Sequence, residues 1–122
     1  MLVASVVWTW FLIMSAAGPT FFANPMWSLG ARDVENEGPP GWAARLRRAS
    51  ENMKENLPLF AGLVLVVHVA GEADELSALG AQLFFSARVL HAIIYVAGIP
   101  HIRTVIWGVS VVAMGLVGLA LL

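Results

Sequence analysis

Residues 102–122 read IRTVIWGVSVVAMGLVGLALL, and this stretch decides the fold class. Its one charged residue, Arg103, lies close to the start, and the residues that follow are almost all apolar or small. An α-helix of roughly 20 apolar residues is long enough to cross the hydrocarbon core of a bilayer. The stretch therefore predicts a transmembrane helix.

The rest of the chain repeats this pattern. Hydrophobic residues make up 59% of the 122 residues and charged residues 12%, whereas a soluble domain is about one quarter charged. Four spans with short connections use up the whole length, so residues 1–122 are expected to form a single membrane domain. The predicted fold is an all-α, integral membrane four-helix bundle. Its helices are expected at residues 2–22, 41–70, 75–97 and 101–122.

Composition excludes several classes of function. The chain has no cysteine, so it forms no disulfide and offers no thiolate as a nucleophile or metal ligand. Its three histidines stand far apart and have no acidic partners at ligand spacing, so no metal site is expected. The net charge is −1 and the few basic residues form no broad cationic surface. Nucleic-acid binding is therefore not expected.

The connections between the predicted helices differ in charge. Residues 24–40 hold polar residues and helix breakers, and they are predicted to form an exposed loop. Residues 71–75 form an acidic turn, whereas basic residues gather around the first and third connections. Because cytoplasmic connections carry the excess of basic residues, both termini are expected to be extracytoplasmic. The basic and histidine residues concerned are Arg32, Arg45, Arg47, Arg48, Lys54, His101 and Arg103.

Tryptophans occur near the ends of the predicted spans, where their amphipathic rings favour the membrane surface. We interpret them as interface anchors rather than as groups that stack on a substrate. They are Trp8, Trp10, Trp27, Trp42 and Trp107.

Two polar stripes lie within the predicted helices. The stripe of the second helix has spacings of three, four and three residues, and that of the third helix has spacings of three and four. Such spacings place the residues of each stripe on one helix face. The stripe residues are Arg45, Arg48, Asn52 and Glu55 in the second helix, and Arg88, His91 and Tyr95 in the third.

Ionisable groups inside a span are costly unless they are paired or hydrated, so the stripes are expected to face each other or a water-filled cleft. One interpretation is structural: Arg88 pairs with Glu55, while Arg45 and Arg48 extend to lipid phosphates. The other is a binding site. Guanidinium groups for carboxylates, an amide, a carboxylate for an amine and a phenol together suit a zwitterionic peptide.

Two segments on these helices resemble the signature of a known family. Residues 48–60 read RASENMKENLPLF, which resembles the RA-x-x-N-x-x-E-x-x-P-x-F signature of MAPEG proteins, the membrane-associated proteins in eicosanoid and glutathione metabolism. Residues 87–95 read ARVLHAIIY, which is similar to the AR-x-x-H-x-x-x-Y stretch on the third helix of that family. Arg103 opens the fourth helix as the basic residue of the family does. The resemblance covers nearly the whole chain.

The resemblance implies an assembly, a cofactor and a reaction. It implies a homotrimer in membrane lipids that binds glutathione between neighbouring subunits. It also implies a glutathione-dependent transferase or peroxidase acting on a lipophilic electrophile that arrives from the bilayer. Arg103 is the candidate catalytic residue, because in catalytic members an arginine holds the glutathione sulfur as a thiolate. The residues expected to bind glutathione are Arg48, Asn52, Glu55, Arg88, His91 and Tyr95.

Two other interpretations stay open. The first helix of mammalian members ends in arginines, whereas the nearest arginine here is Arg32 in the first connection. The chain thus resembles a bacterial-type member, expected in a bacterial inner membrane, and it could bind glutathione or lipid without catalysis. The second alternative is a structural membrane subunit whose polar stripes only pair helices. Glutathione binding distinguishes this last interpretation from the others.

Overall fold

The computed structural model describes residues 1–31 and 41–122, and these residues form helices and no strand. Four of the helices, α1, α3, α4 and α5, are long and apolar enough to cross a membrane. The predicted all-α, four-helix membrane fold is confirmed. The elements are α1 (Leu2–Ala23), α2 (Pro25–Leu29), α3 (Gly41–Ala70), α4 (Glu75–Ala97) and α5 (Pro100–Leu119).

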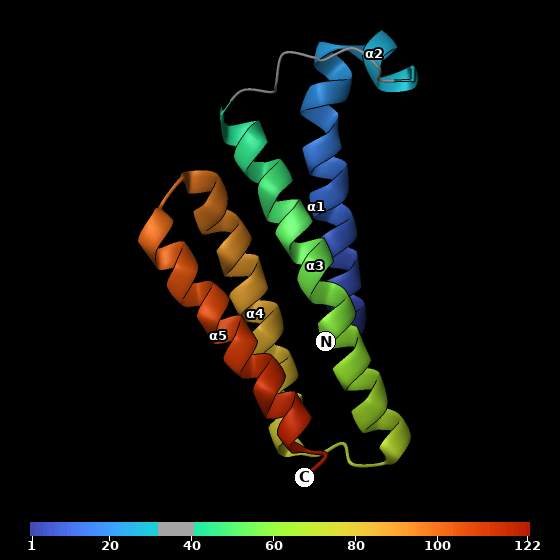
Figure 1. Cartoon of the computed structure of the whole chain (residues 1–122), viewed down its shortest axis with the longest axis vertical. Coiled ribbons are helices and arrows are strands. Elements are labelled where there is room, and N and C mark those ends of the chain that lie inside the picture. The colour runs from blue at the N-terminus through green and yellow to red at the C-terminus, as the bar shows by residue number, and fades with distance from the viewer. Residues whose placement is uncertain (32–40) are drawn as a thin grey trace.

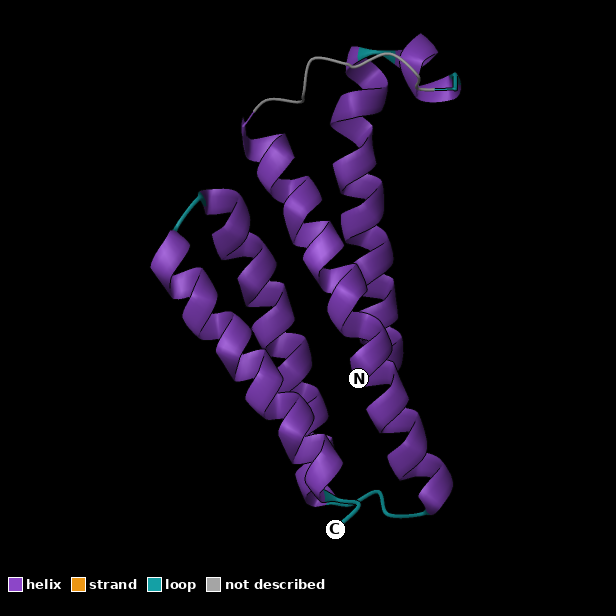
Figure 2. Ribbon diagram, in the orientation of Figure 1, coloured by secondary structure: helices purple, strands orange, loops and turns teal. Residues whose placement is uncertain are grey.

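The long helices form two pairs of neighbours (Figures 1 and 2). α1 lies along α3, α4 lies along α5, and α3 also packs against α4, which joins the pairs. The α3–α4 turn and the C-terminus lie at one end of the bundle, whereas α2 and the α4–α5 connection lie toward the other. This arrangement brings the polar first half of α3 close to the second half of α4 and the start of α5.

The core between the two pairs is centred on aromatic stacking. The rings of Phe60 on α3 and Phe84 on α4 stack with their centroids 4.0 Å apart and their planes at 10°. Both side chains are fully buried. Lipid offers apolar side chains nearly as good an environment as protein does, so close packing of this kind is what holds helices together in a membrane.

Both ends of α4 are closed by specific hydrogen bonds. At its start, the Ser77 backbone N–H donates to Asp74 Oδ1 at 2.7 Å, and the Asp74 backbone N–H donates to Ser77 Oγ at 2.9 Å, which is a capping box. The first of these bonds holds the pKa of the Asp74 carboxyl below its usual range. At its end, Gly98 adopts φ +80° and Arg45 Nε donates to the Val96 carbonyl at 2.8 Å.

The first connection differs from the loop predicted at residues 24–40. Pro25–Leu29 forms the short helix α2, because proline suits the first turn of a helix, where its missing N–H has no partner to lose. The remainder of that prediction, including Arg32, lies outside the described residues. At the other end of the chain, α5 begins at Pro100 and ends at Leu119 rather than spanning residues 101–122.

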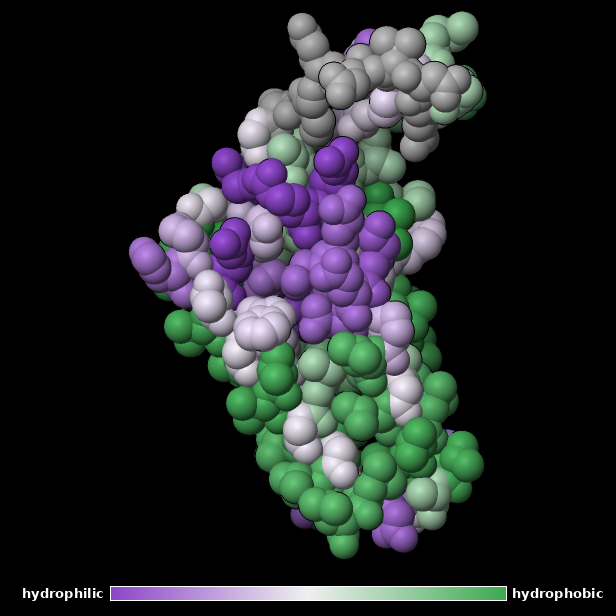
Figure 3. Space-filling model, in the orientation of Figure 1, coloured by the Kyte–Doolittle hydropathy of each residue, from purple (hydrophilic) through white to green (hydrophobic). Residues whose placement is uncertain are grey.

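Polar and apolar surfaces separate along the bundle (Figure 3). Hydrophilic residues gather over the first half of α3 and the neighbouring ends of α4 and α5, whereas the surface toward the α3–α4 turn is apolar in this view. Large apolar side chains are exposed on all four long helices, among them Trp10, Val69, Ile93 and Val105. Such a surface suits contact with lipid tails.

Candidate functional site

A cavity of about 230 Å³ lies between α3, α4 and α5 at the polar part of the bundle. We call it the polar cavity. It contains four of the predicted site residues: one from α3, two from α4 and one from α5. Its lining residues are Asn52, His91, Tyr95, Arg103, Thr104 and Trp107.

Tyr95 lies at the centre of a row of three side chains. The Arg103 guanidinium carbon lies 4.5 Å from the centroid of the Tyr95 ring, a distance at which a cation is attracted to the ring face. The His91 and Tyr95 rings also meet edge to face, with their centroids 5.5 Å apart. Because His91 and Tyr95 are one helical turn apart, α4 sets this row, and the tight turn at Gly98 returns the chain so that Arg103 completes it.

Arg88 lies behind the cavity rather than in its lining. Its side chain is only 1% exposed. Its Nη2 donates to Asn52 Oδ1 at 2.6 Å and its Nε donates to Met53 Sδ at 3.3 Å. Nη1 has no hydrogen-bond partner among the described residues. Arg88 therefore connects α4 to α3 through the amide that lines the cavity.

Two predicted site residues lie apart from the polar cavity. Arg48 and Glu55 are exposed on α3 and do not line it. The structural alternative, in which Arg88 pairs with Glu55, is wrong in this chain because the partners of Arg88 are Asn52 and Met53. In the described part of the chain, the ion pair found is between Arg47 and Glu51, at 3.9 Å on the surface of α3.

Sequence reasoning missed two lining residues, Thr104 and Trp107. Trp107 was interpreted as an interface anchor, yet it lines the polar cavity with 43% of its surface exposed. Its position four residues after Arg103 was the available signal, because residues at that spacing share a helix face. Thr104 gave no such signal, because a single threonine beside Arg103 is unremarkable near the start of a transmembrane helix.

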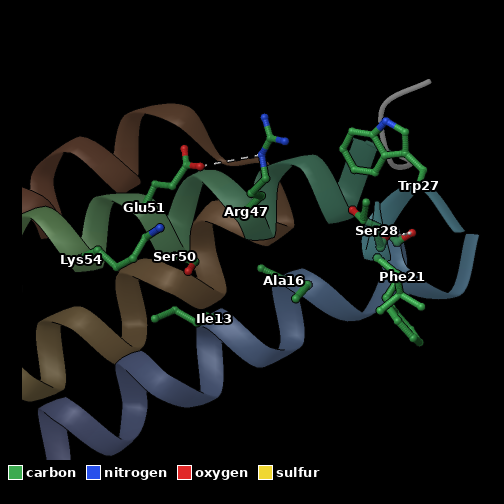
Figure 4. Close-up of a pocket in the computed structure, with 12 residues that line it drawn as sticks. Ile13, Ala16, Phe21, Trp27, Ser28, Arg47, Ser50, Glu51 and Lys54 are labelled. Carbon is green, nitrogen blue, oxygen red and sulfur yellow. Dashed lines mark hydrogen bonds and ion pairs between the residues drawn. The ribbon is translucent and has the colours of Figure 1, made fainter. Parts of the chain in front are cut away.

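A second cavity, of about 550 Å³, lies on the opposite side of α3, against α1 and α2. We call it the α1–α3 cavity. Figure 4 shows its two walls: Ile13 and Ala16 come from α1, and Arg47, Glu51 and Lys54 come from α3. One wall is therefore mainly apolar and the other is charged. The two cavities have no lining residue in common.

The chemistry of the polar cavity is that of a receptor for an anionic, acceptor-rich group. Arg103 can only donate hydrogen bonds and always carries a positive charge, while the Tyr95 hydroxyl and the Asn52 amide can also donate. Among the described residues, the lining includes no acidic one. Because the cavity is within a membrane protein and partly shielded from water, such donors act more strongly there than in bulk water.

The fold and this cavity define a polytopic helical membrane protein with a cationic binding cavity near one end of its bundle. The sequence model of the MAPEG family matches residues 1–122, the whole chain, so the protein belongs to the MAPEG family. Comparisons with curated proteins and with solved structures returned no significant match. Membership fits glutathione-related transferase or peroxidase roles, or related ones, in a membrane.

Proposed function

We propose that this protein is a membrane-bound, glutathione-dependent transferase or peroxidase acting on a lipophilic electrophile. The observation that carries the proposal is the meeting of Asn52, Tyr95 and Arg103, from three different helices, in one cavity whose described lining has no acidic residue. A purely structural subunit would have no need of such a cavity, because polar groups that only join helices pair with each other.

The donors of the polar cavity fit a peptide with carboxylates and a thiol. Glutathione supplies the thiol that serves as nucleophile. Arg103 has the role of stabilising the ionised sulfur, because a nearby cation favours a thiolate over a thiol. Tyr95 holds the Arg103 guanidinium over its ring face, and Asn52 supplies an amide at the α3 side. His91, 3% exposed, supports Tyr95 from behind.

The lipophilic substrate has a candidate site in the α1–α3 cavity. This cavity combines an apolar wall with a charged one, which suits an amphipathic molecule entering from the bilayer. However, α3 separates it from the polar cavity of the same chain. Ligands in the two cavities could react only if the α1–α3 cavity of one subunit faced the polar cavity of its neighbour, so this substrate site depends on the proposed homotrimer with sites between subunits.

The exposed charges of α3 also fit the proposed homotrimer. Arg48 and Glu55 are exposed on a helix that is long and apolar enough to span the membrane. Charged side chains on a spanning helix face protein or water rather than lipid. A neighbouring subunit would cover this face and bring Arg48 and Glu55 to its glutathione site.

We further propose a bacterial inner membrane location, with the polar cavity on the cytoplasmic side and both termini extracytoplasmic.

Calorimetry of glutathione binding, together with ultraviolet absorbance of the thiolate, tests the proposal on the full chain in detergent. The wild type is expected to bind glutathione and to show a thiolate band, and Arg103→Ala is expected to lose the band. Glu72→Gln is the control for a change of charge, because Glu72 is exposed in the α3–α4 turn and does not line the polar cavity. Absence of glutathione binding to the wild type would reject the proposal.

A non-catalytic binding protein is the second candidate. α1 carries no basic residue in its last turn, so that end of the helix offers no second cation to a bound ligand. In this case, glutathione would bind without a thiolate band, and Arg103→Ala would change only its affinity.

Light scattering of the same detergent preparation gives the number of chains in the assembly, and a mass other than three chains would contradict the homotrimer.

A further inference from the structure

The hydrogen bond between Arg88 and Asn52 determines which part of the Asn52 amide is available to a ligand. A primary amide has one oxygen that accepts and one NH2 group that donates. Arg88 can only donate, so the amide oxygen must face it, and the reverse orientation would place donor against donor. Arg88 is only 1% exposed, so bulk solvent does not compete for this bond.

The other contact of Arg88 is too weak to release Asn52. Met53 Sδ accepts from Arg88 Nε at 3.3 Å, but a thioether is a poor acceptor. Nη1 has no partner among the described residues. Among the described residues, the Asn52 amide oxygen is therefore the stronger of the two acceptors that Arg88 contacts, which makes loss of this bond costly.

The backbone of Asn52 is held as well. Its carbonyl accepts from the Asn56 side-chain NH2 at 2.8 Å, and Asn56 is itself buried. With its side-chain oxygen turned toward Arg88, Asn52 has its side-chain NH2 group as the part of the amide directed away from Arg88 and available to the polar cavity. The amide thus adds a donor beside the Arg103 guanidinium.

We infer that Arg88 is a positioning residue that fixes Asn52 as a hydrogen-bond donor, so that the polar cavity selects the carboxylate form of its ligand. This inference rests on the proposed binding of glutathione and specifies which group Asn52 recognises. Arg88 acts through Asn52 and does not touch the ligand. A carboxylate gains a bond from the amide and the attraction of the cation, whereas an ester gains a weaker bond and no charge attraction.

Glutathione and glutathione diethyl ester are the probes that test the inference, with the dissociation constant of each measured by calorimetry on the full chain in detergent. A hydrogen bond to a charged group contributes about 1.5–3 kcal/mol, so the wild type is expected to bind the free acid roughly 10- to 100-fold more tightly. Asn52→Ala should remove the part of this preference that the amide bond supplies and leave the part that the Arg103 charge supplies. Asn52→Asp should also remove the part from the amide, because the carboxylate can still pair with Arg88 but cannot donate to the ligand.

Variants of Arg88 test its action through Asn52. Arg88→Met should lower the preference to that of Asn52→Ala, and Arg88→Lys should restore part of it, because an ammonium can still donate to the amide oxygen. In the Asn52→Ala background, Arg88→Met should have no further effect on the preference. Met53→Leu is the matched control, since it removes only the weak acceptor, and it should keep the wild-type preference.

The outcomes separate this inference from the proposed function. If the wild type binds both probes equally, the inference fails while glutathione binding stands. If Arg88→Met changes the preference even without Asn52, Arg88 acts on the ligand directly and the positioning role is wrong. If neither probe binds, both proposals are overturned. Should Arg88→Met fail to fold, Asn52→Asp still tests the inference. A preference for the acid over the ester as large as that of the wild type would contradict donation by Asn52.

Discussion

Phe60 of α3 and Phe84 of α4 stack face to face with their ring centroids 4.0 Å apart, and this pair joins the two helix pairs of the bundle at its centre. Both rings are 0% exposed. The pair lies on the apolar side of Asn52 and Arg88, so its packing supports the hydrogen bond that those residues make between the same two helices.

Phe84→Ala is expected to destabilise the bundle by leaving a cavity between α3 and α4. In soluble cores such a change costs about 3–5 kcal/mol, and in a membrane the cost should lie below that range, because lipid also accommodates apolar side chains. Unfolding in mixed micelles measures it. Ile93→Ala, at a 58% exposed position of the same helix, is the control and should change stability little. Equal effects of the two changes would contradict a packed α3–α4 interface.

Gly80→Ala is expected to push α4 away from α5. A Cβ at this position would lie 2.8 Å from the Ala113 carbonyl oxygen and 3.0 Å from the Val117 backbone nitrogen, both of which are rigid. Overpacking of this kind costs about 1–3 kcal/mol. Gly108→Ala is the matched control on α5, because a Cβ there meets nothing within 4 Å. The same unfolding measurement should show a loss only for Gly80→Ala.

The stability of the α4 N-terminus should depend on pH through Asp74. The bond from the Ser77 backbone N–H lowers the pKa of this carboxyl in the folded chain, so its contribution is fully present above the unfolded pKa of about 3.9. The contribution is lost as the pH falls through the lower folded pKa. Thermal unfolding at a series of acidic pH values measures this loss. Asp74→Asn, which keeps an acceptor oxygen but does not titrate, should remove that part of the pH dependence.

Tyr95→Leu is expected to weaken glutathione binding, because the Arg103 guanidinium loses the ring face that holds it. A cation–π contact contributes about 0.5–2 kcal/mol, which corresponds to roughly 2- to 30-fold in the dissociation constant. Tyr95→Phe keeps the ring and should retain most of the affinity. Calorimetry measures both variants. If both lose affinity equally, the hydroxyl rather than the ring is what matters.

Part of the candidate site could be predicted from spacing within one helix. His91 and Tyr95 share a face of α4 because they are four residues apart, and the structure places both in the polar cavity. Arg48, Asn52 and Glu55 share a face of α3 by the same rule, yet only Asn52 lines that cavity in this chain. Spacing groups residues on a face, but it does not say how much of that face a neighbouring helix covers.

The hydrogen-bonding role of each residue depended on contacts between helices. Arg88 looked like a ligand-binding arginine in the sequence, but it lies behind Asn52 and is 1% exposed. Trp107 looked like an interface anchor, but it lines the polar cavity because α5 turns that face toward α4. Neither position could be derived from the order of residues, since both depend on the rotation of each helix about its own axis.

The sequence by itself determined that this protein is a bundle of four transmembrane helices of the MAPEG family. Within a bilayer, a long apolar segment satisfies its backbone hydrogen bonds by forming a helix. The hydropathy of the sequence therefore predicts the number of spans. The tertiary structure decided which polar side chains meet. Those meetings depend on helix packing, on the close approach at Gly80 and on the turn at Gly98, which bring side chains of different helices, such as Tyr95 and Arg103, into contact.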